Sequence, residues 1–291
     1  MRILVFGGDG MLGHELLRSW GDRHEVWATL RQDEAAYRAA GRAASARTLH
    51  GIDCRRTEAL VAAVAQARPA LVVNAVGIVK QRPSAQDHLA SIEVNALLPH
   101  RLAEVCRAAG ARLVHLSTDC VFSGEKGAYV EGDPPDPTDL YGRSKLLGEV
   151  VQPHVLTLRT SIIGLELGRA GSLVEWFLAQ RGRIKGFRRA IYSGLTTMEL
   201  ARAIERLVTE QPALHGLWHL ASEPIDKFDL LTRLSRRLDR RDVEVLPDDG
   251  LVCDRSLDAS ALRARTTYRV PGWDAMLAEL AEQVRRRASP P

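Results

Sequence analysis

The chain has 291 residues, of which 45% are hydrophobic and 26% are charged. A chain of this size buries a full core, and we expect one large domain with a smaller companion lobe. The net charge of +4 is small and the basic residues are interleaved with acidic ones, which argues against nucleic-acid binding. The longest mostly apolar run, residues 71–79, is far shorter than the roughly 20 residues of a membrane helix, so no membrane span is expected.

The four cysteines, Cys54, Cys106, Cys120 and Cys253, form no Cys-x-x-Cys pattern and have no nearby histidine cluster. We therefore predict neither a metal site nor a disulfide framework. Free thiols suit a reducing compartment, and the N-terminus runs straight into an apolar stretch without a cleavage-site pattern. These features together predict a cytoplasmic protein.

The first two-thirds of the chain alternates short apolar runs with helix-like segments, a pattern typical of repeated βα units. The predicted strands cover residues 3–6, 25–29, 70–73, 112–117 and 155–159. The predicted helices cover residues 11–20, 57–67, 88–109 and 144–151. The expected fold is α/β, a Rossmann-type doubly wound parallel sheet that binds ligands at the carboxyl ends of its strands.

The alternation loosens after about residue 165. Helices are predicted at residues 172–180, 197–210, 226–238 and 273–287, with extended pieces at 217–220 and 243–246. We predict an NAD(P)-binding domain over residues 1–165 and a smaller, mainly helical substrate lobe over residues 166–291, interleaved with late sheet strands. Residues 124–139 are rich in Gly, Pro and Asp, which predicts a long loop beside the substrate.

A glycine-rich turn follows the first predicted strand, with the spacing Gly7-x-x-Gly10-x-x-Gly13. Such a turn brings the backbone close to a pyrophosphate, and the N-terminus of the following helix supplies N–H groups and a positive dipole end. We expect Gly7, Gly10, Met11 and Leu12 to contact a dinucleotide. The other reading is a sharp strand-to-helix turn without a ligand.

The end of the second strand predicts which dinucleotide binds. In NAD-binding proteins an Asp or Glu at this place accepts a hydrogen bond from a hydroxyl of the ribose. The segment Thr29-Leu30-Arg31 has no such residue. Arg31 suits a 2′-phosphate instead, so NADPH is favoured and NADH remains the alternative. Asp53 and the adjacent Cys54 are candidates for the adenine edge, although a plain loop aspartate fits the sequence almost as well.

Small residues end the next strand, in the order Asn74-Ala75-Val76-Gly77. They allow the backbone to lie against a cofactor ribose, whereas small residues at a strand end also simply pack. Lys80 follows them and is expected to overhang the substrate.

A second group of polar residues lies near the middle of the chain. Tyr141 and Lys145 are four residues apart, so they share one face of a helix, and an ammonium near a phenol favours the phenolate. Ser117 and Thr118 end a strand about twenty residues upstream, where a hydroxyl can hydrogen-bond the reacting oxygen. Without the other motifs, a tyrosine and a lysine at this spacing are an ordinary pair of neighbouring side chains on a helix. Beside the glycine turn it predicts hydride chemistry on a carbonyl or an alcohol.

These motifs resemble a known family. They are Gly7-x-x-Gly10-x-x-Gly13, Asn74-Ala75, Ser117-Thr118-Asp119-x-Val121-Phe122, Tyr141-Gly142-x-Ser144-Lys145 and Leu158-Arg159-Thr160-Ser161. In order and spacing they look like the extended short-chain dehydrogenase/reductases, and most of all like the dTDP-4-dehydrorhamnose reductase branch. The resemblance covers nearly the whole chain. The motifs around Thr118 and Tyr141 are specific to that branch, and the glycine turn is not.

The resemblance implies a nucleotide-activated 4-keto-6-deoxyhexose as substrate, reduced at C4 by NADPH. Tyr141 would protonate the new alkoxide, Thr118 would help to polarise the carbonyl, and Lys145 would hold the nicotinamide ribose and tune the tyrosine. Ser117 joins the expected cofactor contacts. The expected substrate contacts are Lys80, Thr118, Asp119, Cys120, Val121, Phe122, Ser161 and Lys185. A homodimer is expected by analogy with the family.

Three departures from the family pattern point to a changed sugar pocket. Ile162 stands where the family has an aromatic residue, and Gly194-Leu195-Thr196-Thr197 lacks the usual proline. Cys120 replaces a tyrosine.

Cys120 leaves a second activity open. GDP-fucose synthases resemble this branch and carry an epimerising cysteine at about this place, so a bifunctional epimerase/reductase is an alternative. Their partner histidine is missing here, because no histidine occurs between His154 and His215. Lys80 or Lys185 would have to replace it. The plainer reading of Cys120 is a small packed side chain.

A third reading is an NADP-binding protein without turnover, like the regulatory subunit of methionine adenosyltransferase, which resembles the same branch. Because Tyr141 and Lys145 are intact, we favour an enzyme.

Overall fold

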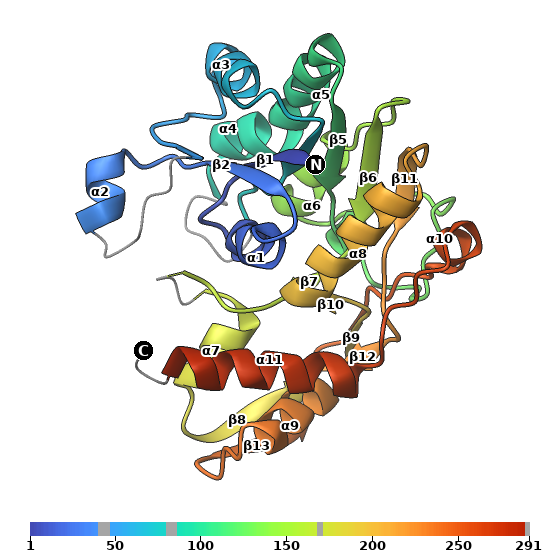
Figure 1. The fold of residues 1–291 in the computed structure, drawn as a ribbon. Coiled ribbons are helices and arrows are strands. Elements are labelled where there is room, and N and C mark those ends of the chain that lie inside the picture. The colour runs from blue at the N-terminus through green and yellow to red at the C-terminus, as the bar shows by residue number, and fades with distance from the viewer. Residues whose placement is uncertain (40–46, 80–85, 168–170, 289–291) are drawn as a thin grey trace. The chain divides into compact units, whose positions relative to one another are not determined.

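The computed structural model describes residues 1–39, 47–79, 86–167 and 171–288. Its largest sheet has seven strands in the order β11-β6-β5-β4-β1-β2-β3 (Figure 1). The strands are β1 (Arg2–Phe6), β2 (Glu25–Thr29), β3 (Thr48–Leu49), β4 (Leu71–Asn74), β5 (Arg112–Leu116), β6 (Val155–Arg159) and β11 (Gly216–His219). β1 pairs in parallel with both β2 and β4, and β4, β5 and β6 continue in parallel. From β1 the sheet grows first toward one edge, through β2 and β3, and then toward the other, through β4, β5 and β6. The predicted doubly wound fold is therefore confirmed.

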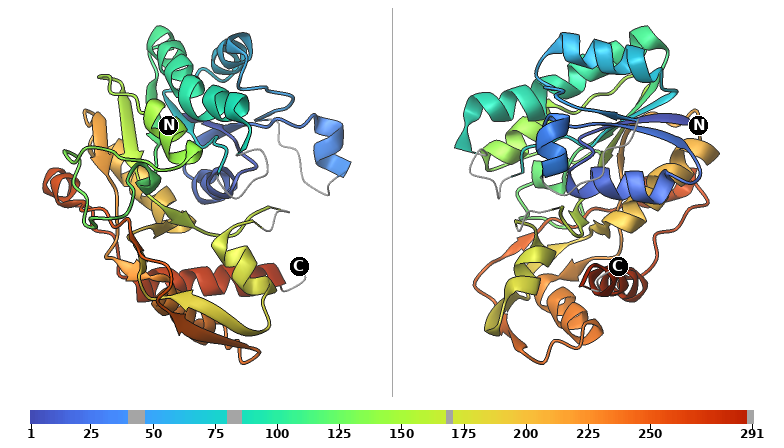
Figure 2. Two further views of the ribbon diagram at one scale, coloured as in Figure 1. Left: turned by 180° about the vertical axis from the view of Figure 1, so that it is seen from behind. Right: turned by 60° about the vertical axis from the view of Figure 1, so that its left-hand side comes forward.

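The helices of this region follow the strands in chain order. They are α1 (Met11–Trp20), α2 (Glu34–Ala39), α3 (Thr57–Ala67), α4 (His88–Ser91), the π-helix η2 (Ile92–Leu97), α5 (Leu98–Ala109) and α6 (Leu140–Leu147). Figures 1 and 2 show α3 and α5 on one face of the sheet and α1 on the other. Both faces are covered, which is why the central strands are apolar throughout.

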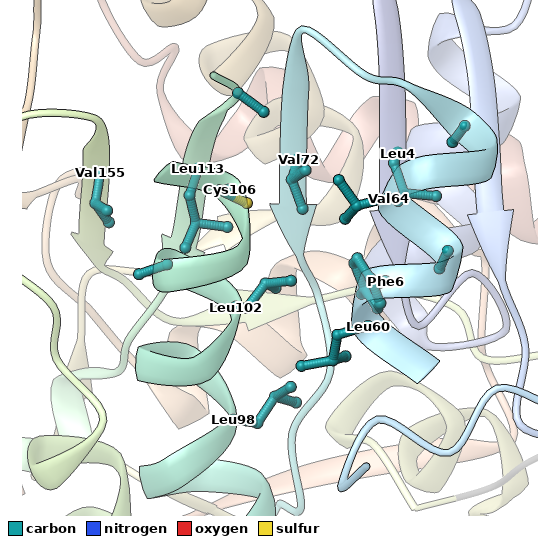
Figure 3. Close-up of a cluster of buried hydrophobic side chains, with 14 of the residues drawn as sticks. Leu4, Phe6, Leu60, Val64, Val72, Leu98, Leu102, Cys106, Leu113 and Val155 are labelled. Carbon is teal, nitrogen blue, oxygen red and sulfur yellow. The ribbon is translucent and has the colours of Figure 1, made fainter. Parts of the chain in front are cut away.

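A buried apolar cluster fills the space between the sheet and helices α3 and α5 (Figure 3). Leu4 and Phe6 are two residues apart on β1, so their side chains face the same side of the sheet. Leu98, Leu102 and Cys106 recur every four residues on α5, and all three are fully buried. Replacing the fully buried Leu102 by Ala would cost about 2–5 kcal/mol of stability, because the removed atoms leave a cavity that the surrounding core fills only in part.

The described chain divides into two compact units. Unit 1 comprises Met1–Ser117, Asp139–Leu158 and Ala213–Leu217, and unit 2 comprises Thr118–Thr138, Arg159–Pro212 and Trp218–Pro291. The chain therefore passes between them several times. The domain boundary after residue 165 stays a prediction.

Unit 2 combines helices with short sheets. Its helices are α7 (Leu173–Ala179), α8 (Thr197–Glu210), α9 (Lys227–Arg237), α10 (Ser260–Arg265) and α11 (Trp273–Ala288), with a 3₁₀ turn η3 (Asp119–Val121). Its strands are β7 (Ile162–Ile163), β8 (Gly182–Phe187), β9 (Ala190–Tyr192), β10 (Leu195–Thr196), β12 (Ile225–Asp226), β13 (Val243–Asp248) and β14 (Cys253–Asp254).

The parallel ribbon of β8 and β13 packs against α9 (Figure 2). Ion pairs run along its exposed side, among them Arg183 with Glu244 at 3.0 Å. The sequence analysis did not predict β8, because charged residues interrupt the apolar pattern of this strand.

None of the helices in the described ranges has the length and apolar character that a bilayer crossing requires.

Candidate cofactor and catalytic site

The glycine turn of unit 1 joins β1 to α1. Gly7 has a φ of +86°, a conformation that favours glycine. A Cβ on Gly13 would lie 2.0 Å from the carbonyl oxygen of Gly7, so only glycine lets the helix start this close to the strand. Gly10 stands at the N-cap, where it has no side chain to accept from the first N–H groups of α1. Those N–H groups, with the helix dipole, suit a phosphate.

Two of the residues predicted for the adenosine end have defined surroundings. The carboxylate of Asp53 accepts from Nε and Nη2 of Arg55, at 2.9 and 2.7 Å, and from the backbone N–H of Arg55 at 3.1 Å, and these hydrogen bonds lower its pKa. Burial raises the pKa of the Cys54 thiol to about 11, so Cys54 stays protonated. Arg31 is exposed, two residues beyond the end of β2. Their contacts with a cofactor stay predictions.

Asn74, at the end of β4, fixes the turn that follows it. Its Oδ1 accepts from the N–H of Val76 at 3.2 Å, and its Nδ2 lies 3.2 Å from Nδ1 of His115. An amide Nδ2 only donates, so His115 must accept at Nδ1. His115 is fully buried, and burial followed by the charge of Lys145 lowers its pKa well below the usual value. A neutral imidazole therefore sets the orientation of the Asn74 amide, and through it the backbone of residues 75 and 76.

Asn95 ties the same turn to the catalytic helix. Its Oδ1 accepts from the N–H of Ile78 at 2.9 Å, and its Nδ2 donates to the Ile78 carbonyl at 3.0 Å and to Oγ of Ser144 at 3.1 Å. Asn95 lies in the π-helix η2, a type of local distortion often found at functional sites. Neither Asn95 nor His115 was predicted. The only sequence signal for either is a polar residue within an otherwise apolar stretch.

Helix α6 carries the predicted tyrosine and lysine. Asp139 caps it by accepting from the N–H of Gly142 at 2.7 Å, and the helix covers Leu140–Leu147. The prediction of a helix over 144–151 was wrong in its limits, because the cap lies just after a proline-rich loop. Tyr141 and Lys145 thus both lie inside the helix, one turn apart on one face, as the chemistry requires.

Lys145 is buried, with 5% of its surface exposed, and its Nζ donates to the carbonyl of Leu116 at 2.5 Å. Burial lowers its pKa to about 8, and the carboxylate of Glu149 opposes that shift. The hydroxyl of Ser117 donates to Glu149 at 2.7 Å. The structure therefore brings Lys145, Ser117 and Glu149 together at the carboxyl end of β5.

In unit 2, Thr118 opens the turn η3. Its hydroxyl donates to Oδ1 of Asp119 at 3.1 Å and accepts from the N–H of Cys120 at 3.1 Å. Val121 and Phe122 are fully buried, and Phe122 stacks on Tyr129 with ring centroids 4.1 Å apart. Their roles as substrate contacts stay predictions.

Cys120 lies beside a cation. Nη1 of Arg255 is 3.7 Å from its Sγ, and Nε of Arg255 donates to the carbonyl of Phe122 at 2.8 Å. Arg255 is 135 positions from Cys120 in the chain, so this contact was not predicted.

Tyr129 anchors the loop that was predicted to lie beside the substrate. Its hydroxyl accepts from the N–H groups of Gly124 and Lys126 at 3.2 and 3.0 Å, and its own N–H donates to Ser256 at 2.9 Å. The loop is thereby tied into unit 2. Its role at the substrate stays a prediction.

The remaining predicted substrate residues are dispersed. The backbone carbonyl of Ser161 accepts from Leu195 at 2.8 Å, where β7 pairs with β10. Lys185 lies on β8 with 75% of its side chain exposed and pairs with Asp248 at 2.8 Å, which leaves less of its charge for a ligand. Lys80 lies outside the described residues. In the described parts of the chain, no group of three or more His, Cys, Asp or Glu side chains has the arrangement of a metal site.

The chain is similar to several known proteins. The family model described as the RmlD substrate binding domain matches residues 1–248. A probable dTDP-4,6-dihydroxy-2-methyloxan-3-one 4-ketoreductase of Streptomyces antibioticus is 30% identical, over 94% of this chain and 88% of that protein. A dTDP-4-keto-6-deoxy-D-glucose reductase of Streptomyces niveus is 33% identical, over 94% of this chain and 89% of that protein.

Among solved structures, a dTDP-4-dehydrorhamnose reductase from Bacillus anthracis str. Ames in complex with NADP is similar, with a TM-score of 0.80 and 20% identity. The likeness covers 97% of this chain and 99% of that chain. At this identity it shows the fold.

Proposed function

This chain belongs to the RmlD substrate binding domain family, and we propose that it reduces the C4 ketone of a nucleotide-linked 4-keto-6-deoxyhexose with NADPH. The observation that carries the proposal is the buried ammonium of Lys145 one helical turn beyond Tyr141. Two relatives named as reductases of dTDP-linked sugars, each matched over 94% of this chain, support the same substrate class.

Unit 1 fits a dinucleotide. The close approach of Gly13 to Gly7 leaves the N-terminus of α1 open to a phosphate, and Arg31 supplies an exposed cation where an acid would favour NAD. When bound, NADPH supplies the hydride that reduces the C4 carbon. We therefore favour NADPH over NADH.

Residues of the chain itself supply the proton that the C4 oxygen gains. The phenolic O–H of Tyr141 donates its proton to the C4 oxygen as the C=O double bond becomes a C–O–H group. Tyr141 is left as a phenolate, which the charge on Lys145 favours. Thr118 supplies a hydroxyl that hydrogen-bonds the same oxygen and orients the ketone, for which it must release Asp119.

The test is to follow NADPH absorbance with dTDP-4-dehydrorhamnose, dTDP-4-keto-6-deoxyglucose and further nucleotide 4-ketosugars. We expect turnover with at least one of them, and a loss of about 10²–10⁴-fold in kcat for Tyr141→Phe with NADPH affinity kept. Tyr268→Phe, which removes a hydroxyl elsewhere in the chain, is the control. Tight NADPH binding without oxidation by any ketosugar would favour the binding protein without turnover.

We further propose that the protein is a homodimer and that it works in the cytoplasm, a compartment that its free cysteines favour. Five large apolar side chains are exposed on α4, η2 and α6 or just after it: Leu89, Ile92, Leu97, Leu147 and Val151. Helices α4, η2 and α6 contact one another, and exposed apolar side chains on neighbouring elements are typical of protein interfaces. Light scattering should give twice the mass of the chain for the native protein, and Leu147→Glu should shift it to the monomer. A native monomer would refute the dimer.

A further inference from the structure

The predicted catalytic lysine of unit 1 is a buried cation. Lys145 is 5% exposed, and its Nζ donates to the carbonyl oxygen of Leu116 at 2.5 Å. A carbonyl is a dipole without net charge, and a buried ammonium without an opposite charge readily loses its proton. The proton transfer proposed for Tyr141 needs the charged form of Lys145. A group that favours this charged form therefore supports the reaction.

Glu149 lies close to this ammonium because of the way in which α6 ends. The N–H of Gly148 donates to the Lys145 carbonyl at 3.1 Å. The N–H of Glu149 donates to the Leu146 carbonyl at 3.1 Å, so the chain keeps coiling past the end of the helix. A Cβ on Gly148 would lie 2.0 Å from the carbonyl oxygen of Asn95, so this coil packs closely against η2. Glu149 thus stays about one turn beyond Lys145.

The end of β5 holds the carboxylate from another side. Oγ of Ser117 donates to Oε1 of Glu149 at 2.7 Å. Ser117 directly follows Leu116, whose carbonyl oxygen accepts from Lys145. The hydroxyl that holds the carboxylate and the carbonyl that holds the ammonium therefore belong to consecutive residues. These hydrogen bonds place both charges at the same end of one strand.

Burial and one carboxylate act on Lys145 in opposite directions. Burial lowers its pKa to about 8, and the charge of Glu149 raises it. On β5, the fully buried imidazole of His115 is neutral and adds no charge. Helices η2 and α4, which pack against α6, carry Glu93 and His88. Glu93 is paired with a guanidinium at 3.9 Å and His88 is exposed, and neither shifts the pKa of Lys145.

We propose that Glu149 is a positioning residue of the reductase, whose carboxylate keeps Lys145 charged while Tyr141 gives up its proton. Glu149 acts through Lys145: the carboxylate favours the ammonium, and the ammonium favours the phenolate that Tyr141 becomes. Ser117 holds the carboxylate in place. The inference rests on the proposed function for the reaction, but the charge of Lys145 can be measured without turnover.

The test follows the charge of Lys145 by NMR. The chain has five lysines, so isotopically labelled lysine gives few signals, and Lys145→Arg identifies the one that belongs to Lys145. We expect a titration midpoint at about pH 8 in the native protein. Glu149→Gln should lower this midpoint by about one pH unit, because the amide still accepts from Ser117 but carries no charge.

Two further variants separate the charge from the fold. Glu149→Asp keeps the charge and should give a midpoint between those of Glu149→Gln and the native protein. Glu104→Gln, which neutralises an exposed carboxylate on α5 that pairs with Arg107 at 2.7 Å, should leave the midpoint unchanged. Equal midpoints in Glu149→Gln and the native protein overturn the inference. Equal midpoints in Glu149→Gln and Glu149→Asp overturn it too, because the charge would then have no effect.

The rate of reduction shows whether the same charge serves the reaction. In Glu149→Gln, kcat/KM for the ketosugar should fall about fivefold at pH 8 and stay near the native value at pH 6, since the lower midpoint leaves less ammonium at pH 8. Equal losses at both pH values overturn the positioning role. If the native protein reduces no ketosugar, the proposed function fails, and the labelled lysine still decides whether Glu149 keeps Lys145 charged.

Discussion

Nδ2 of Asn74 lies 3.2 Å from Nδ1 of His115, across two parallel strands in which these residues are register partners. Because the imidazole is neutral and accepts, the Asn74 amide has a single orientation, with Oδ1 turned toward the N–H of Val76. A buried residue that was not among the predicted site residues thus positions the backbone that is predicted to face the cofactor.

Replacing His115 with Leu should weaken NADPH binding about tenfold, because the unpaired amide is free to rotate and release Val76. The free energy of unfolding should fall by about 1–3 kcal/mol for the buried, unsatisfied Nδ2. Fluorescence titration with NADPH and urea unfolding measure the two effects. His115→Gln, which restores an acceptor, should recover part of the affinity, and native affinity in His115→Leu would contradict a positioning role.

Arg31→Met should weaken NADPH binding about tenfold or more and leave NADH binding unchanged, because a charge-assisted hydrogen bond to the 2′-phosphate is lost. Arg38→Met is the matched control, since Arg38 is an exposed cation on α2 that pairs with Glu34. Equal losses for the two cofactors would mean that Arg31 does not read the 2′-phosphate.

The rate of ketone reduction should fall as the pH rises through about 8, the pKa to which burial lowers Lys145. The ammonium is present below that pH and lost above it, and with it the charge that favours the Tyr141 phenolate. Lys145→Met should lower the rate of ketone reduction by about 10²-fold or more. Lys145→Arg should move the fall in this rate to higher pH. A flat profile of kcat/KM between pH 7 and 9 in the native enzyme would rule this out.

Glu199 should make stability depend on pH. It is buried on α8 and pairs with Arg202, which also reaches Glu279 on α11, and burial raises its pKa to about 7. The folded state therefore binds more protons than the unfolded state between about pH 4.5 and 7, so this contribution to stability is full at low pH and is lost as the pH rises through 7.

Glu199→Gln should consequently raise the free energy of unfolding by about 1–3 kcal/mol at pH 8 and change it little at pH 5. Urea unfolding at both pH values measures this. Glu282→Gln, on the exposed part of α11, should change neither value. The same stability difference at both pH values would show that Glu199 does not titrate in this range.

Cys120 should react with iodoacetamide before Cys54 and Cys106, because burial raises the pKa values of those two thiols to about 11 and about 12. Arg255→Met should slow the reaction, since it removes the cation 3.7 Å from Sγ. Mass spectrometry of the alkylated peptides gives the order. A fully unreactive Cys120 would mean that it is a packed core residue.

The same cysteine tests the epimerase alternative. A reductase alone should release a product without solvent deuterium at C3 or C5. Deuterium uptake that Cys120→Ser abolishes while reduction continues would establish a bifunctional enzyme.

The family and the doubly wound fold were predictable because their signals are local. The apolar strands of unit 1 and the glycine turn each lie within a few residues, and the motifs around Thr118 and Tyr141 are specific to one branch. The comparisons confirm both predictions.

What the sequence did not reveal depends on residues far apart in the chain. His115 acquires its role from the register between β4 and β5, and Asn95 from a π-helix that no periodicity predicts. Arg255 contacts Cys120 from 135 positions away. The predicted roles of the site residues themselves stay predictions until the variants above are measured.

The chain passes between its two units at Ser117–Thr118, Thr138–Asp139, Leu158–Arg159, Pro212–Ala213 and Leu217–Trp218. Neither unit is therefore one continuous stretch of sequence, and a single recombination between two homologous genes cannot transfer either unit whole. A chimera joined after residue 165 would contain pieces of both units from each parent. Point substitution, at places such as Cys120 and Ile162, is then the simpler route by which such a protein changes its sugar, and exchange of a complete lobe is the harder one.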